Sequence, residues 1–476
     1  MSKVARNSIV LMVSQILGKV ISFVFIVFIA RYLGSQDFGK YSFVIAFIVI
    51  PNILVTFGMD SLLVREVARD KDRYSVYVSN VFFLKSVFAV FMVFAVFVLV
   101  NVTGISGDPV KSVCLMVFSF TIILNPLQQT LWAVSDAYEE MQYHSLLFII
   151  WNLIRTFLGI GILYGGYGLN TLFMGFLVSE AVNLAVSYTV ISGRFGVPEW
   201  KIDIKFCRSL LKATLPLAVF HICIIICQRV DTIILSIVSG DRAAGWYNAA
   251  HNLMLALLFI PTSIVNSAFP HLSQNFNKSK ELFMNTYFNT FKYLFLIGLP
   301  LAVWTTFLSG KIISLFYDVE YANSAVILQI LIWSLFMSFM NSLLANTIIA
   351  MNKERIIAGI LGAATVTNIA LNVILVPLGG YIGAAVSRIG CDAVIMVAGS
   401  VVFYRSFSRI PFPAVCVKIL IMNAAVFAGV YMLGDLPLLL TAALVVGIYG
   451  GASFALGLLG KYEVVAMKNA VRGMFG

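Results

Sequence analysis

The chain has 476 residues, of which 61% are hydrophobic and only 11% are charged, and its formal net charge is +11. Soluble proteins carry about a quarter charged residues, so this composition excludes an ordinary soluble enzyme or soluble binding domain. Apolar segments that reach the roughly 20 residues needed to cross a bilayer recur along the whole chain. We therefore expect an all-α polytopic membrane protein.

We predict about fourteen transmembrane helices. The first follows Lys3 and Arg6, but its apolar run is too long for a signal peptide and no small-residue cleavage site follows it, so we expect it to be retained. In chain order the predicted spans are 7–31, 38–63, 76–101, 110–135, 143–165, 169–192, 213–239, 243–270, 288–309, 322–350, 356–376, 380–403, 413–434 and 437–459.

Charge in the connecting segments predicts the orientation. One alternate set of connections holds twenty of the 32 Lys and Arg residues, and the opposite set holds five. Basic residues concentrate on the cytoplasmic side of membrane proteins, so we expect a multi-pass protein of the cell (plasma or inner) membrane with both termini in the cytoplasm. This distribution accounts for the net charge without a nucleic-acid partner. The acidic stretch "SDAYEEMQYH" (135–144) departs from the pattern.

The two halves of the chain repeat a weak pattern. Segment 32–58 resembles segment 237–269, and Asn152 corresponds to Asn368. At a fixed offset, Gly34, Gly39 and Tyr41 match Gly240, Gly245 and Tyr247. Six spans per repeat preserve orientation, so we predict two pseudo-symmetric six-helix bundles about an axis along the membrane normal, with the substrate site between them. The predicted domains are an N-terminal lobe, 1–192, a basic cytoplasmic linker, 193–212, a C-terminal lobe, 213–404, and two C-terminal accessory helices with a cytoplasmic tail, 405–476.

Seven ionisable residues lie deep inside the predicted spans. Insertion scales put each central charge at about 2.5–3.5 kcal/mol, so these residues should face one another or water rather than lipid. The four cations, which we interpret as candidate binding residues for an anionic headgroup, are Lys19, Arg155, Arg229 and Arg388, and the three acids are Glu180, Asp231 and Asp392. Lys85, Lys292 and Lys418 lie nearer span ends and are expected to extend to the membrane surface.

Polar residues at helical spacing share faces with these charges. Such stripes on the first, fifth, seventh and eleventh spans predict a water-filled cavity between the lobes, whose amide, hydroxyl and imidazole groups would contact a sugar. The candidate cavity residues are Gln15, Ser22, Asn152, His221, Gln228, Asn368 and Asn372.

Structural roles compete with functional ones for several of these side chains. Arg388 and Asp392 are four residues apart on one helix and can pair with each other. Glu180, Asp231 and Asp392 are therefore assigned either to ion coupling or to structural pairing. No complete set of metal ligands and no G-x-x-x-x-G-K-[ST] motif is present, so we expect no catalytic residue, no metal and no cofactor.

Two stretches and the predicted architecture carry a family resemblance. The segments "ARYLGSQDFGKYSF" (30–43) and "QRVDTIILSIVSGDRAAGWYNAA" (228–250) resemble the polysaccharide-transporter branch of the MOP exporter superfamily. That branch contains the O-antigen and other lipid-linked oligosaccharide flippases, and it is related to the lipid II flippase and to MATE transporters. The resemblance implies transport of a polyprenyl-phosphate- or pyrophosphate-linked oligosaccharide from the cytoplasmic to the outer leaflet. The implied partners are that substrate, membrane lipids and polysaccharide-assembly proteins, and we expect a monomer.

Two other functions compete with this one. A cation-coupled multidrug antiporter of the MATE branch should favour acids in its cavity, whereas here the central bases outnumber the acids four to three. A membrane enzyme such as a glycan polymerase needs sizeable outer loops, and the predicted outer loops are short. Because a bare phosphate loses many kcal/mol on entering hydrocarbon, a cationic cavity favours a flippase that works by alternating access.

Overall fold

The chain is helical throughout the part that the computed structural model describes, which is residues 3–104, 107–276, 278–409, 415–432 and 437–458. The α-helices are α1 (Lys3–Thr56), α2 (Met59–Arg69), α3 (Tyr74–Thr103), α4 (Pro109–Ser119), α5 (Thr121–Ala137), α6 (Met141–Tyr164), α7 (Leu169–Phe195), α8 (Ile204–Ser239), α9 (Asp241–Leu257), α10 (Phe259–Phe276), α11 (Lys280–Phe316), α12 (Ser324–Ala350), α13 (Glu354–Phe407), α14 (Val415–Met432) and α15 (Leu438–Ala455). Two short 3₁₀ helices, η1 (Lys71–Arg73) and η2 (Val319–Tyr321), complete the described elements.

The prediction of an all-α polytopic membrane protein is confirmed. Within the described residues, 11 helices are long and apolar enough to cross a membrane, and a shorter apolar helix spans Leu440–Ala455. The count of fourteen spans stays a prediction, because α1 and α13 each run for 54 residues across a break. The tail 459–476 of the predicted last domain lies outside the described residues.

The breaks inside α1 and α13 lie at glycines. Gly34 in α1 has φ 71° and ψ 173°, and Gly380 in α13 has φ 53° and ψ −128°. Positive φ is readily available only to glycine, so each long helix is two helices joined at a sharp bend. Gly240, the repeat partner of Gly34, has φ 86° and ψ 165° and separates α8 from α9 in the same way.

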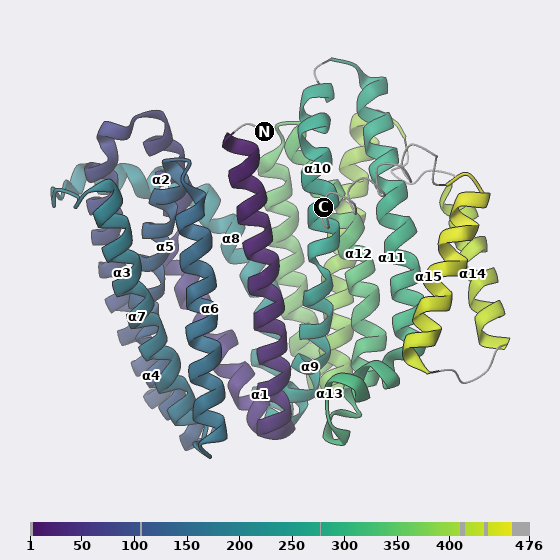
Figure 1. Ribbon diagram of the computed structural model, residues 1–476, viewed down its shortest axis with the longest axis horizontal. Coiled ribbons are helices and arrows are strands. Elements are labelled where there is room, and N and C mark those ends of the chain that lie inside the picture. The colour runs from purple at the N-terminus through teal and green to yellow at the C-terminus, as the bar shows by residue number, and fades with distance from the viewer. Residues whose placement is uncertain (1–2, 105–106, 277, 410–414, 433–436, 459–476) are drawn as a thin grey trace.

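The helices gather in two groups. Figure 1 shows α3–α7 on one side and α9–α15 on the other, with α1 and α8 between them. Helices α14 and α15 lie at the outer edge of the second group, against α11. This arrangement places α1 and α8 where they can present side chains to both groups.

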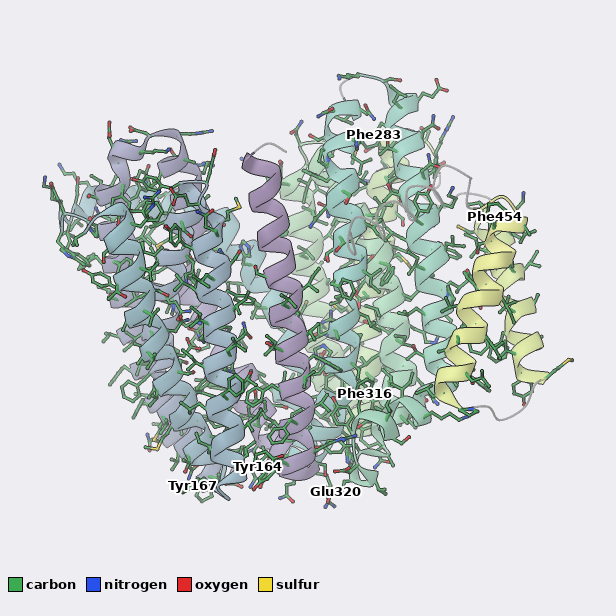
Figure 2. All side chains as sticks on the ribbon, in the orientation of Figure 1. Tyr164, Tyr167, Phe283, Phe316, Glu320 and Phe454 are labelled. Atoms are coloured by element: carbon green, nitrogen blue, oxygen red, sulfur yellow. The ribbon has the colours of Figure 1, made fainter. Side chains whose placement is uncertain are left out.

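The two groups meet tightly at the end of the molecule that is far from the start of α1. We call this end, formed by residues 31–43, 108–111, 236–246 and 315–321, the closed end; Figure 2 shows Glu320 there and Phe283 at the other end. A β-carbon at Gly39 would collide with the carbonyl oxygen of Asp241, and one at Gly245 would collide with that of Ser35. The contact is reciprocal between repeat-related positions, which supports the predicted pseudo-two-fold relation.

Polar contacts also join the two groups at the closed end. Lys111 Nζ lies 2.8 Å from Asp241 Oδ1. Arg31 donates from Nε to the Phe316 carbonyl and from Nη2 to the Leu315 carbonyl, each at 2.7 Å. Backbone and charged groups therefore hold this end shut in the present conformation.

Lys85 corrects one expectation from the sequence. Its side chain is fully buried rather than extended to the membrane surface. Its Nζ lies 2.6 Å from Asp60 Oδ1, 2.7 Å from Thr130 Oγ1 and 2.9 Å from the Pro126 carbonyl. A charge-assisted set of hydrogen bonds from α2 and α5 replaces water around the ammonium group, so the expected position near the surface was wrong.

Candidate functional site

A cavity of about 310 Å³ lies among the N-terminal helices, and we call it the N-terminal cavity. The second half of α1 and helices α4–α7 form its walls, and α8 contributes Ile225. The volume is at the low end of the range of roughly 300–1,000 Å³ for small-molecule sites. The polar residues that line it and matter below are Asn52, Asn125, Gln129, Trp151, Arg155 and Glu180.

Arg155 is held in this cavity by aromatic rings. It lies one turn after Trp151 on α6, so both side chains face the same side. Its guanidinium carbon lies 4.4 Å from the centre of the Phe176 ring and 5.6 Å from that of Trp151. Its Nε is buried without a hydrogen-bond partner. Cation–π contacts stabilise the charge and leave N–H groups available to an incoming acceptor.

Glu180 faces Arg155 from α7. Its side chain is 5% exposed, and Arg155, Trp151 and Asn125 lie around the carboxylate. Its Oε2 and the indole Nε1 of Trp151 are both buried without a hydrogen-bond partner. A carboxylate that lines a cavity in this state can accept a hydrogen bond from a ligand or bind a proton.

Arg155 and Arg229 both lie near the hydroxyl group of Tyr41. Tyr41 of α1 is buried, and both arginines lie close enough to interact with its hydroxyl group electrostatically. Arg229 is on α8, one turn after the cavity-lining Ile225, and its Nε is also buried without a partner. One arginine from each half of the chain therefore lies within electrostatic range of the same tyrosine.

The first predicted span contributes less than its polar stripe indicated. Lys19 is exposed on α1, and the side chain of Gln15 lies outside the described residues. Ser22 donates from Oγ to Asn152 Oδ1 at 2.7 Å, and Asn152 donates from Nδ2 to the Phe148 carbonyl at 2.9 Å. Ser22 and Asn152 thus tie α1 to α6.

Two candidates on α8 are half-buried. His221 has its ring centre 5.6 Å from that of Phe220, and Gln228 directly precedes Arg229. Both lie on the helix that stands between the two groups in Figure 1.

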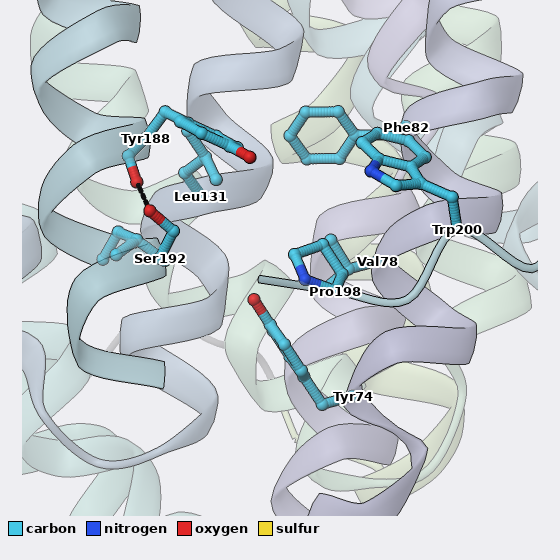
Figure 3. Close-up of a pocket in the computed structure, with 9 residues that line it drawn as sticks. Tyr74, Val78, Phe82, Leu131, Tyr188, Ser192, Pro198 and Trp200 are labelled. Carbon is cyan, nitrogen blue, oxygen red and sulfur yellow. Dashed lines mark hydrogen bonds between the residues drawn. The ribbon is translucent and has the colours of Figure 1, made fainter. Parts of the chain in front are cut away.

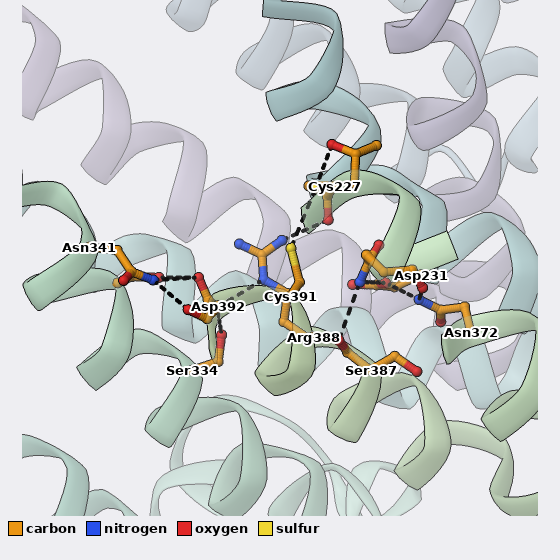
Figure 4. A network of polar contacts seen from close by, with 12 residues as sticks. Cys227, Asp231, Ser334, Asn341, Asn372, Ser387, Arg388, Cys391 and Asp392 are labelled. Carbon is orange, nitrogen blue, oxygen red and sulfur yellow. Dashed lines mark hydrogen bonds and ion pairs between the residues drawn. The ribbon is translucent and has the colours of Figure 1, made fainter. Parts of the chain in front are cut away.

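The remaining candidates lie in a different place, which we call the C-terminal network (Figure 4). Asp231 accepts hydrogen bonds from Tyr247 Oη at 2.8 Å, from Asn372 Nδ2 at 2.6 Å and from Asn368 Nδ2 at 3.1 Å. All four side chains are buried. The network therefore joins α8, α9 and α13 through one carboxylate.

Arg388 and Asp392 complete this network. The Nε of Arg388 lies 3.4 Å from Asp392 Oδ2, and its Nη1 donates to the Cys227 carbonyl at 2.7 Å. Asp392 also accepts from Ser334 Oγ and, at 3.2 Å, from Ser338 Oγ. The sequence alternative in which Arg388 and Asp392 pair is the geometry observed.

The structure therefore separates the predicted site residues into two sets. It brings Arg155, Arg229 and Glu180 to the N-terminal cavity or its edge, and it places Arg388, Asn368 and Asn372 in the C-terminal network. Sequence reasoning missed several cavity residues, whose only signal was helical spacing to one another or to Arg155. These are Asn52, Asn125, Gln129 and Trp151.

Cysteines give no metal site in the part of the chain that the structure describes. No group of three or more His, Cys, Asp or Glu side chains there is placed to hold a metal ion. Cys227 and Cys391 lie 3.5 Å apart between their sulfur atoms inside the C-terminal network, and both are free thiols.

A second, smaller pocket lies where the predicted linker meets the N-terminal helices (Figure 3). Val78, Leu131, Pro198 and Trp200 help to line it, and its volume of about 10 Å³ is too small for a glycan. Asn80 of α3 holds the linker, since its Nδ2 donates to the Lys201 carbonyl at 3.0 Å and its Oδ1 accepts from the Asp203 N–H at 2.8 Å. This pocket belongs to the docking of the linker.

Comparison with known proteins gives the family. The model of the polysaccharide biosynthesis protein family matches residues 4–276, and the MatE model matches residues 216–374. A putative O-antigen transporter of Shigella flexneri is 25% identical over 393 residues, which is 78% of this chain and 91% of that protein. The probable low-salt glycan biosynthesis flippase Agl15 of Haloferax volcanii is 24% identical over 389 residues, which is 80% of each chain.

Solved structures agree on the fold. The lipid II flippase MurJ in an inward closed conformation superposes with a TM-score of 0.79 at 16% identity, over 94% of this chain and 98% of that one. An inward-facing multidrug resistance MATE family transporter of the MOP superfamily gives 0.69 at 13% identity, over 86% and 98%. These relatives are transporters and flippases rather than enzymes. The chain belongs to the polysaccharide biosynthesis protein family, on the polysaccharide-transporter branch of the MOP exporter superfamily.

Proposed function

We propose that this protein is a flippase that moves a polyprenyl-phosphate- or pyrophosphate-linked oligosaccharide from the cytoplasmic to the outer leaflet. Its relatives support this proposal, since they include a putative O-antigen transporter and a probable glycan biosynthesis flippase. The protein works in the cell membrane with both termini in the cytoplasm. Its partners are the lipid-linked substrate, membrane lipids and polysaccharide-assembly proteins, and it acts as a monomer.

One observation carries the proposal. Arg155 and Arg229, one from each half of the chain, both lie within electrostatic range of Tyr41 near the N-terminal cavity, and each has a buried Nε without a partner. A guanidinium group matches phosphate geometry through paired hydrogen bonds. A phosphate that binds here replaces its lost hydration with two fixed positive charges, which lowers the barrier to crossing hydrocarbon.

Movement across the membrane then requires the closed end to open. Lys111 and Asp241 would separate, and so would the reciprocal contacts of Gly39 and Gly245. With both termini in the cytoplasm, the closed end faces outside, so the headgroup reaches the arginines from the cytoplasmic side. Lys19, exposed on α1, adds positive charge along the same helix.

A leaflet assay tests the proposed function. Accessibility of the lipid-linked oligosaccharide to an impermeant reagent outside the cell is compared between cells with and without the protein. We expect Arg155→Ala and Arg229→Ala to slow appearance of the outer headgroup by more than about tenfold, the usual effect of losing a hydrogen bond to a charged group. Arg208→Ala, at an exposed position near the start of α8, is the matched control. Unchanged headgroup appearance in cells without the protein would contradict the flippase.

A MATE-like cation-coupled multidrug antiporter is the second candidate function. The MatE match to residues 216–374 and the buried carboxylate of Glu180, whose Oε2 has no hydrogen-bond partner, favour it. It predicts that cells expressing the protein export a cationic dye and that Glu180→Gln abolishes this export. If cells with the protein export no more dye than cells that lack it, the antiporter function is wrong.

A further inference from the structure

The N-terminal cavity collects buried polar atoms that lack partners. Asn52 Oδ1, Trp151 Nε1, Arg155 Nε and Glu180 Oε2 line the same space and make no hydrogen bond of normal geometry with the protein, although Trp151 and Asn125 lie close to the Glu180 carboxylate. Each such group loses about 1–3 kcal/mol relative to a satisfied one. Four of them around one cavity point to a ligand that brings both donors and acceptors.

The charges of this cavity balance. Arg155 and Glu180 are its only charged lining residues among those described, and they have opposite signs. A phosphate inside it would gain from Arg155 but would also lie against the Glu180 carboxylate. The ligand group that occupies the cavity itself is therefore uncharged, while an anion is better placed between Arg155 and Arg229 at Tyr41.

The lining suits hydroxyl groups on a ring. Each hydroxyl donates and accepts, and the cavity offers a carboxylate acceptor, guanidinium and indole donors, and amides that do both. Gln129 Nε2 donates to Asn125 Oδ1 at 2.7 Å, which fixes these two amides relative to each other. Planar polar side chains held in this way can recognise the positions of several hydroxyls at once.

Trp151 supplies an apolar face. Its ring centre lies 6.4 Å from that of Trp132 and 6.0 Å from that of Phe148. An aromatic face carries partial negative charge and attracts the C–H groups on the apolar side of a sugar ring. The cavity of about 310 Å³ has room for one small ring system, not for a whole oligosaccharide with its diphosphate.

We propose that the N-terminal cavity is a sugar-binding subsite, in which Glu180, Asn125, Gln129 and Trp151 recognise one sugar ring of the lipid-linked glycan. This inference rests on the proposed flippase function and divides the substrate between two places. The phosphate binds the arginines at Tyr41, and the adjoining ring enters the cavity. Selection among glycans then depends on the cavity rather than on the arginines.

Binding to the full-length protein in lipid nanodiscs tests the subsite. The probes are farnesyl diphosphate, and farnesyl diphosphate that carries one glucose, galactose, N-acetylglucosamine or N-acetylgalactosamine. We expect the wild type to bind at least one sugar-bearing probe about tenfold more tightly than farnesyl diphosphate alone. Glu180→Gln and Gln129→Ala should each remove most of this preference and change the affinity for the sugar-free probe less than about twofold.

The outcomes distinguish the two proposals. Arg155→Ala should weaken binding of every probe, and Gln142→Ala, at an exposed position in the first turn of α6, should change none. If the arginine variant behaves as expected but the wild type prefers no sugar, or Glu180→Gln and Gln129→Ala both keep the preference, the sugar subsite is wrong and the flippase stands. If the sugar-free probe binds equally well to wild type and to Arg155→Ala, the phosphate site itself is wrong. A thermal unfolding curve for each variant confirms that it is folded, and Gln129→Ala decides the question if Glu180→Gln does not fold.

Discussion

The N-terminal cavity and the C-terminal network use corresponding positions of the two halves in opposite ways. Asn152 bonds to Ser22 beside an open cavity, whereas its repeat partner Asn368 donates to the buried Asp231. Tyr41 lies near Arg155 and Arg229, whereas its partner Tyr247 donates to Asp231. The N-terminal cavity leaves polar groups facing open space, whereas the C-terminal network pairs most of its polar side chains with one another.

This difference separates binding from structure on physical grounds. A buried polar network that satisfies its members stabilises one arrangement of helices, as Asp231 and Arg388 do for α8, α9 and α13. Unsatisfied groups are rare in native proteins. Those of the N-terminal cavity line open space that a ligand can enter, whereas those of the C-terminal network, such as Arg388 Nε and Asn372 Oδ1, belong to buried side chains between packed helices. Mutation of corresponding residues should therefore change stability in one half and binding in the other.

The largest expected difference in the free energy of unfolding is between variants of two arginines, Arg388 and Arg155. Arg388→Ala removes one partner of a buried ion pair and leaves the buried Asp392 carboxylate without a positive charge beside it. We therefore expect a loss of about 3–5 kcal/mol in the free energy of unfolding. Arg155→Ala removes cation–π contacts without breaking an ion pair and should lose less than about 1 kcal/mol. Urea unfolding of both variants in detergent, followed by circular dichroism, measures the pair. Equal losses in the two variants would show that Arg155 stabilises the fold as much as Arg388 does, and the distinction between the C-terminal network and the N-terminal cavity would be wrong.

A smaller difference in the free energy of unfolding is expected between variants of two asparagines, Asn372 and Asn52. Asn372→Ala removes the donor that lies 2.6 Å from Asp231 Oδ1, and we expect a loss of about 1–3 kcal/mol. Asn52→Ala removes a cavity amide whose Oδ1 has no partner, so the free energy of unfolding should change by less than about 0.5 kcal/mol. The same unfolding measurement applies, and a greater loss for Asn52→Ala would show that the cavity amide is structural.

Local sequence features predicted much of the fold. Hydropathy gave the apolar helices, because membrane insertion depends on segments of about 20 residues. The matching of Gly34 with Gly240 and of Gly39 with Gly245 was visible in the sequence, and the structure places the first pair at helix breaks and the second pair in reciprocal contact. These features follow from short stretches of chain, so sequence reasoning reached them.

Pairing of charges was not predictable in the same way. Lys85 was expected near the surface but is buried against Asp60, a residue of another helix. The acidic stretch 135–144 had no explanation from sequence, and in the structure Glu140 pairs with Arg194 at 2.8 Å. Such partners are set by the packing of helices far apart in the chain. For that reason the sequence offered Arg388 a partner on its own helix, Asp392, but could not show which residues of other helices surround the seven central charges.

The closed end offers a test of how the two halves communicate. Lys111→Met removes the 2.8 Å ion pair with Asp241 and should weaken closure, so peptides covering 31–43 and 236–246 should exchange amide hydrogen at least about threefold faster. Peptides covering 283–300, at the other end, are the internal control and should not change. Hydrogen-exchange mass spectrometry of the nanodisc-embedded protein measures both. Unchanged exchange at the closed end would show that backbone packing at Gly39 and Gly245 holds it without the ion pair.

The smallest expected effect is a pH dependence at the same end. Asp108 lies 2.9 Å from Lys40 Nζ, and this contact lowers the pKa of its carboxyl below the ordinary value of 3.8. Because the folded pKa is the lower one, the stabilisation is complete above about pH 4 and is lost as the pH falls through the folded value. Asp108 is partly exposed at the surface, so solvent screening limits the contribution to less than about 1 kcal/mol. Asp108→Asn keeps an N-cap acceptor for α4 and removes only the charge. Its thermal midpoint should lie slightly below that of the wild type at neutral pH, and the two should meet once the pH falls below the lowered pKa of Asp108 and the carboxyl is protonated. A constant difference at every pH would assign the effect to the cap.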